Sequence, residues 1–491
     1  MIRKNFSLFF VILFLVTNQI ISSDDYSFCG PPPRAKQHRR SASEMFPPLP
    51  LPATPLRRTE KKRPPRPLPV IGKIKYDKKT EVWNSARGDL DGLMDFFNTT
   101  LKMQYGYKTV ILNEFTYDVN ETPVLYITGH SDFTFTKDQV GKIRQYLDAG
   151  GFLIGDACCG SEIFSKAFKR ECEKIYTNIP LRKAPPDHPI YLTYFHLDRV
   201  KYNRTIEGNT SGSAQIYTID IGCRSAVIFH QYNLSCGWNG IQYDRPVVKS
   251  IAIDDALKLG VNEILYILEY RKYAKIFEDI KVNNSKNISK NQFTFAQVKH
   301  TGDWDPHKGF SNFLESLKEK TKGRYNIGRK TVSLRDRDLF SYPFLYLTGH
   351  HAFSLSQSEF KNLKTYLEKG GFLLIDNCCG RQIFDESVQQ LMVSLSENSK
   401  LSLIEKTHPL YHCFYEIQGV HYTREVVGDD VKSLYQPVLQ GLKVNNHYAV
   451  VYSRFGLGSG WQNVYIPHSR RIQHQDSINL GVNIVVYALT H

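Results

Sequence analysis

The stretch "VLYITGHSDFTFTKDQVGKIRQYLDAGGFLIGDACCGSEIF" (residues 124–164) recurs without a gap at 344–384, as "FLYLTGHHAFSLSQSEFKNLKTYLEKGGFLLIDNCCGRQIF". Three further segments recur in the same order: 188–202 at 408–422, 225–238 at 448–461, and 254–268 at 475–489. Self-similarity over such a distance predicts a duplicated domain. We therefore expect a first domain over 70–275, a linker over 276–290 and a second domain over 291–491.

Each copy alternates short apolar runs with segments of helical periodicity. In the first copy "KTVILNEF" (108–115), "PVLYITG" (123–129) and "FLIGDA" (152–157) are typical of buried strands. A helix is predicted after Thr136, its N-cap, with a stop at Gly150, and a second helix over 161–175. This alternation predicts an α/β domain with a parallel sheet covered on both faces, which binds ligands at the carboxyl ends of its strands.

The N-terminal region has a different composition. Residues 1–23 have a basic start and a short apolar run, the pattern of a signal peptide for export to the periplasm or the medium. Residues 24–69 contain most of the prolines and are predicted to be a disordered, basic linker. Residues 31–70 alone hold ten Lys or Arg against two Glu, so much of the formal charge of +15 lies outside the domains. We therefore expect no nucleic-acid partner, and membrane contact only through an uncleaved signal anchor or the basic linker.

Two strand-end turns carry the first candidate residues. His130 follows Gly129, and His350 follows Gly349, each directly after a predicted buried strand. Such a turn could offer backbone amides to an anion, with the histidine as an acid, base or ligand. The alternative is a structural role, in which glycine supplies a tight turn and histidine bonds a neighbouring loop.

The "DACCG" and "DNCCG" turns carry the second set. Cys158 and Cys378 follow strands and precede helices, a position that favours a nucleophilic thiolate, although the preceding Asp156 and Asp376 oppose ionisation. The alternatives are a disulfide or metal ligand, or a buried thiol that fills a corner. The nine cysteines include no Cys-x₂-Cys pair and no clustered histidine spacing, so the sequence predicts neither a metal nor another cofactor.

Two further pairs recur in both copies. His188 and His408 precede prolines and could act as a base or cap a loop. Trp238 and Trp461 could stack on a sugar or pack in the core.

The "PFLYLTGH", "LKTYLEKGGFLLIDNC", "HPLY" and "VVYS…GW" motifs resemble DUF4159, a bacterial domain family of unknown function, over both copies. That family is similar in turn to the class I glutamine amidotransferase-like superfamily and to ThuA-like proteins. The resemblance implies two tandem flavodoxin-like domains. It places the Gly-His turns at the oxyanion position and Cys158 and Cys378 at the nucleophile position.

The sequence departs from the amidotransferase pattern at two points. In amidotransferases a glycine leads the nucleophile elbow, the turn between strand and helix that carries the nucleophile; here Asp156 or Asp376 takes its place. The "His-Pro-Glu" motif of that superfamily has Ile190 or Leu410 in place of glutamate. We therefore expect an exported, non-catalytic ligand-binding or scaffold protein of the cell envelope, with a carbohydrate or envelope protein as partner. The alternative is a cysteine-dependent hydrolase or amidotransferase-like enzyme that uses the "DxCCG" turn.

Overall fold

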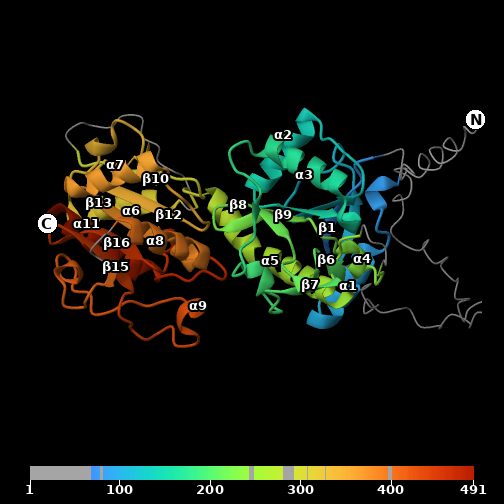
Figure 1. Cartoon of the computed structure of the whole chain (residues 1–491). Coiled ribbons are helices and arrows are strands. Elements are labelled where there is room, and N and C mark those ends of the chain that lie inside the picture. The colour runs from blue at the N-terminus through green and yellow to red at the C-terminus, as the bar shows by residue number, and fades with distance from the viewer. Residues whose placement is uncertain are drawn as a thin grey trace, which may run out of the picture.

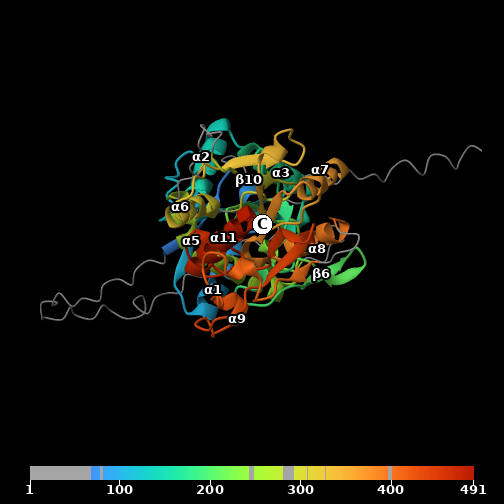
Figure 2. The ribbon, with the colours of Figure 1, turned by 90° about the vertical axis from the view of Figure 1, so that its left-hand side faces the viewer.

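The computed structural model describes residues 68–77, 81–242, 248–279, 292–306, 308–326, 328–395 and 401–490. Two α/β domains lie end to end (Figure 1), and a view along the long axis places the second in front of the first (Figure 2). The predicted signal peptide and nearly all of the predicted linker lie outside the described residues. No described helix is long and apolar enough to span a membrane.

The first domain contains a seven-stranded sheet in the order β2-β1-β3-β4-β9-β8-β5. Five strands form its parallel part: β1 (Leu68–Ile74), β2 (Tyr105–Val110), β3 (Val124–Gly129), β4 (Phe152–Ala157) and β9 (Arg224–His230). Their order is that of flavodoxin-like sheets. The sheet is extended by the antiparallel β8 (Ile216–Ile221) and β5 (Arg182–Lys183), and β6 (Val200–Ile206) pairs with β7 (Asn209–Gly212) separately.

Helices cover both faces of this sheet because its central strands are apolar on both sides. One layer is α2 (Lys137–Asp148) and α3 (Glu162–Ile175), which pack on residues such as Leu125 and Leu153. The opposite layer is α1 (Asp89–Leu101), α4 (Ser235–Trp238) and the long α5 (Ile253–Asp279), which pack on Tyr126 and Ile154. Figure 1 shows α2 and α3 above the sheet and α5 below it.

The second domain repeats this plan, with strand order β11-β10-β12-β13-β16-β15-β14. Its strands are β10 (Phe295–Lys299), β11 (Lys330–Ser333), β12 (Phe344–Gly349), β13 (Phe372–Asn377), β14 (Ser402–Leu403), β15 (Leu439–Val444) and β16 (His447–Ser453). Its helices are α6 (Gly309–Thr321), α7 (Gln357–Glu368), α8 (Gln382–Leu395), α9 (Arg424–Val427), α10 (Gly458–Trp461) and α11 (His474–Thr490).

Most of the predicted elements are present. β3, β4 and α3 occupy the expected segments, and Thr136 caps α2 in a full capping box with Gln139. Gly150 follows α2 with φ +102°, the left-handed conformation expected of a helix stop. The strand predicted over 108–115 is displaced: β2 begins at Tyr105 and ends at Val110, because the chain turns at Leu112–Glu114. α5 also runs past residue 275, the predicted end of the first domain.

Candidate functional site at the domain junction

The aspartates of the "DxCCG" turns are structural acceptors in the buried ends of β4 and β13. Asp156 accepts hydrogen bonds from Leu234 N (2.9 Å) and from the hydroxyl of Ser235 (2.6 Å). Asp376 likewise accepts from Leu457 N (2.6 Å) and Gly458 N (2.9 Å). Both carboxylates are fully buried. They tie the loop that follows the neighbouring strand to the sheet end, in the place where a ligand would otherwise approach.

The two tryptophans belong to the core. Trp238 and Trp461 are buried, and their indole N–H groups donate to Ala256 O (2.8 Å) and Ser477 O (2.9 Å). Trp461 also stacks on Phe313 with ring centroids 4.3 Å apart. This geometry favours the packing alternative over sugar stacking.

His188 and His408 cap short turns of 3-10 helix. Nδ1 of each accepts a hydrogen bond of 3.2 Å from the backbone N–H two residues later, Ile190 N or Leu410 N. Burial, and then the Arg381 guanidinium, lower the pKa of His188 to about 3, so its imidazole is neutral. The capping alternative is the one that these contacts support.

The Gly-His turn of the second domain is closed by an aspartate that the motifs did not reveal. Asp303 Oδ1 accepts from His350 N (2.8 Å) and His351 N (2.9 Å), and Asp303 Oδ2 lies 2.7 Å from His350 Nδ1. The carboxylate thus occupies the amide donors that an oxyanion would need. Gly349 leaves it room, because a Cβ there would lie 3.1 Å from Asp303 Oδ1.

The Gly-His turn of the first domain is built differently. A Cβ on Gly129 would lie 2.2 Å from the Tyr76 hydroxyl, so a larger residue there would displace that side chain. His130 is buried, and its backbone carbonyl accepts a short hydrogen bond of 2.6 Å from Ser161 Oγ. Val82 stands in the repeat position of Asp303, so the first domain lacks that carboxylate.

Each cysteine pair forms a strained corner between strand and helix. Cys158, Cys159, Cys378 and Cys379 are all buried, and none is in a disulfide. The second cysteine of each pair has positive φ, 57° at Cys159 and 61° at Cys379. A strained residue in the sharp turn between a strand and a helix is typical of a nucleophile elbow. The strained residue is therefore the second cysteine of each pair, one position after Cys158 or Cys378, where the resemblance places the nucleophile.

A third cysteine reaches the second pair from the other domain. Cys223 lies in the turn between β8 and β9, and its Sγ is 3.7 Å from Cys378 Sγ, which is 3.9 Å from Cys379 Sγ. The ligand atoms of Cys223, His350, Cys378 and Cys379 all lie within 4.8 Å of one another. We call these four residues the junction cluster. In the first domain His130, Cys158 and Cys159 form a corresponding set of three.

The junction cluster perturbs the ionisation of its members. Neighbouring Cys223 and Cys378 thiols, and then the charge of His350, lower the pKa of Cys379 well below its usual value. Burial is the main cause that raises the pKa of Cys378. Although burial disfavours a charged imidazole, Asp303 and then Cys379 raise the pKa of His350.

The junction itself is held by polar contacts that range from buried to exposed. His351 Nε2 lies 2.6 Å from Asp220 Oδ2, and Asp187 Oδ2 accepts from Gln382 N (2.9 Å) at the start of α8. Farther along the interface, the Tyr270 hydroxyl donates to Pro467 O (2.7 Å). Cys378, Cys379, Val464 and Ile466 of the second domain belong to the hydrophobic core of the first domain, so that core extends across the junction.

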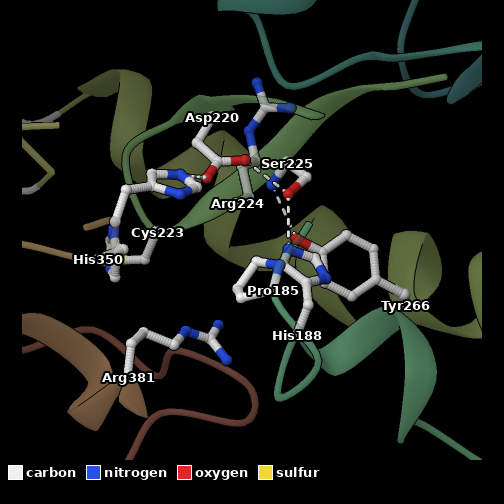
Figure 3. A pocket seen from close by; sticks show the side chains of 10 residues that line it. Pro185, His188, Asp220, Cys223, Arg224, Ser225, Tyr266, His350 and Arg381 are labelled. Carbon is white, nitrogen blue, oxygen red and sulfur yellow. Dashed lines mark hydrogen bonds and ion pairs between the residues drawn. The ribbon is translucent and has the colours of Figure 1, made fainter. Parts of the chain in front are cut away.

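A small polar cavity lies beside these contacts (Figure 3). Figure 3 shows His188, Asp220, Ser225 and Arg381 converging on it from both domains. Its volume of about 10 Å³ is enough for a single water molecule. A substrate could not enter it without a rearrangement of the junction.

Two segments of the chain, residues 70–268 and 294–489, match the family described as "Domain of unknown function (DUF4159)". The chain belongs to the DUF4159 family. A search of curated proteins finds no match. The two DUF4159 segments coincide with the two sheets, so each copy is a complete α/β domain.

Sequence reasoning missed three residues that form the site: Cys223, Asp220 and Asp303. Cys223 aligns with Asn446 in the second DUF4159 domain, and Asp220 with Lys443, so a comparison of the two copies gives no reason to group them with the site. The cysteine spacing predicted no metal-ligand set; this stays a prediction, although the described residues include a group that could hold an ion. The fold brings together ligands that lie 155 residues apart, Cys223 and Cys378, from different domains.

Proposed function

We propose that this chain is an exported, non-catalytic scaffold of two DUF4159 domains that work as one rigid unit, with a carbohydrate or envelope protein as its partner. The observation that carries the proposal is the closure of the second domain's sheet end. There Asp303 occupies the amides of the Gly-His turn, and the first domain packs on the Cys378–Cys379 corner. A hydrolase needs both features open to its substrate.

Differences between the repeats support a dedicated contact between the domains. Asp220 and Cys223 meet the second domain, whereas their counterparts there are Lys443 and Asn446. On the facing side, His351 of the second domain corresponds to Ser131 of the first. The residues that meet at the junction are therefore not repeated at the equivalent positions of the other domain. The contacts of Asp220 and Cys223 with the second domain are specific to the junction between the domains.

Native-state alkylation mapping tests the non-catalytic assignment. We expect iodoacetamide at neutral pH to leave Cys159 and Cys379 unmodified until the protein is unfolded. Cys413, which is partly exposed, is the internal control and should react in the native state. Rapid modification of Cys379 in the folded protein, ahead of Cys413, would overturn the assignment.

A cysteine-dependent hydrolase is the second candidate, since one observation favours it. Cys379 has the strained backbone that is typical of a nucleophile elbow, and His350 is paired with Asp303 at 2.7 Å, as in a Cys-His-Asp triad. This candidate requires the junction to open. An ester or amide substrate turned over by the wild type but not by Cys379→Ala would establish it.

A further inference from the structure

We propose that Cys223, His350, Cys378 and Cys379 bind one Zn²⁺ ion, which links the two domains. The four ligand atoms converge within 4.8 Å, and all four residues are buried. With Zn–S bonds of about 2.3 Å, two sulfurs of a tetrahedral site lie about 3.8 Å apart. The observed separations are 3.7 Å for Cys223–Cys378 and 3.9 Å for Cys378–Cys379.

The donor set determines the metal. Three thiolates and one imidazole are soft and borderline ligands, which select zinc over magnesium or calcium. Cys₃His is an established ligand combination of structural zinc sites, which have four protein ligands and no open position. The adjoining cavity of about 10 Å³ holds no more than one water, which fits a closed, structural site.

The imidazole is oriented for coordination. Nε2 of His350 is buried without a hydrogen-bond partner among the described residues, while Nδ1 lies 2.7 Å from Asp303 Oδ2. The contact with Asp303 holds a proton on Nδ1, so a metal would bind at Nε2 and displace any proton there. A carboxylate behind a histidine ligand is the usual second shell of a zinc site.

Simple packing of thiols explains less of this geometry. Two sulfurs in van der Waals contact would also lie near these distances, so the separations alone do not decide the matter. Packing would, however, offer the buried Nε2 of His350 only weak thiol contacts with Cys223 and Cys379. A metal satisfies that nitrogen and all three sulfurs at once.

The fourth ligand is present only where the domains meet. Cys223 lies in the β8–β9 turn, and the equivalent turn of the second domain has Asn446. Among the described residues of the first domain, only His130, Cys158 and Cys159 converge. Cys236 Sγ lies 4.0 Å from Cys158 Sγ but does not complete that set. The proposal therefore concerns the junction cluster alone.

The test is the zinc content of the full-length protein, purified under reducing conditions with zinc present and then dialysed against a competing chelator. We expect the wild type to retain zinc and Cys223→Ser to lose about one equivalent per chain. Cys172→Ser and Cys413→Ser remove thiols outside the cluster and should retain the wild-type content. Asp303→Asn should weaken zinc affinity by about 10–100-fold, the usual effect of a lost second-shell partner.

A second measurement on the unaltered protein does not depend on the folding of any variant. Co²⁺ bound to the wild type should give the intense visible bands of a tetrahedral ion and a thiolate charge-transfer band. A wild type that takes up neither metal would overturn the proposal. So would full zinc retention by Cys223→Ser, or a Cys223–Cys378 disulfide found by mass spectrometry of the native protein.

Discussion

At the residue scale, the two domains keep one fold by exchanging residues in compensating pairs. Gly155 leaves room for the ring of Phe168, to which a Cβ at residue 155 would come within 2.3 Å. The second domain has Ile375 and Val388 at these positions, so volume has moved from one side chain to the other. A buried charge pair changes in the same way: His230 and Glu263 are replaced by Ser453 and Ile484.

His230 should make the stability of the first domain depend on pH. Its Nε2 lies 2.7 Å from Glu263 Oε1, and the histidine is fully buried. Although burial disfavours the charged form, Glu263 and then Asp156 raise the pKa of His230 to about 9. The folded protein keeps this proton up to about pH 9, whereas the unfolded chain loses it near pH 6.5. The stabilisation is therefore complete below about pH 6.5. It should be lost as the pH rises to about 9.

Urea unfolding followed by tryptophan fluorescence measures this loss, since Trp238 lies 6.4 Å from the His230 ring. The matched control is the double variant His230→Ser/Glu263→Ile, which installs the second domain's residues and should remove the pH dependence in this window. Equal slopes of unfolding free energy against pH in wild type and double variant would contradict the prediction. The single variant His230→Ser leaves Glu263 buried and unpaired, and should be less stable by about 3–5 kcal/mol.

At the element scale, the hairpin between β8 and β9 places Cys223 in the junction cluster. Its two-residue turn is Gly222–Cys223, with φ +64° at Gly222. The equivalent hairpin between β15 and β16 turns at Asn445–Asn446, with φ +50° and +69°. Two left-handed positions are typical of a type I′ turn. In the hairpin that enters the junction, only the first position is left-handed, so Cys223 itself is not strained.

Gly222→Ala should disrupt this hairpin more than the matching change in the second domain. A Cβ at Gly222 would lie 2.8 Å from Phe277 and from the Tyr273 hydroxyl, in addition to the left-handed backbone. Asn445→Ala has only the backbone cost, about 1 kcal/mol. We expect Gly222→Ala to lower the unfolding free energy by at least twice as much, as measured by urea denaturation. Equal effects of the two variants would show that the packing around Gly222 relaxes freely.

The elements could be predicted from the sequence, and the site only in part. Strand β4 and the capping box at Thr136 follow from local periodicity and cap chemistry, which short segments encode. The roles of Asp156 and Asp376 could not be predicted, because their partners lie about 80 residues away, in a repeated segment whose recurrence does not show what it contacts. Cys223 was missed for the same reason, since its partners belong to the other domain.

At the scale of the whole molecule, the junction makes the tandem one unit. The domains are connected by the contacts His351–Asp220, Asp187–Gln382 and Tyr270–Pro467, and the first domain's core extends into the second. Tyr270–Pro467 is buried and His351–Asp220 partly buried, so truncation of one partner there would leave the other unsatisfied, whereas Asp187–Gln382 is exposed. The two domains should therefore move together.

Cutting the chain between the domains tests this unity. With a protease site placed within residues 280–290, we expect both halves to co-elute in gel filtration after cleavage. Removing zinc, or the change Cys223→Ser, should lower the co-eluting fraction, whereas Asn446→Ser at the equivalent turn should not. Separation of the zinc-loaded wild-type halves immediately after cleavage would refute the rigid junction.

The most direct measurement is anomalous X-ray diffraction from crystals of the full chain at the zinc absorption edge. We predict one peak bounded by Cys223, Cys378, Cys379 and His350 Nε2, about 2.3 Å from each sulfur. An absence of anomalous density at this position in zinc-loaded protein, or a peak confined to His130, Cys158 and Cys159, would contradict a zinc ion that joins the two domains.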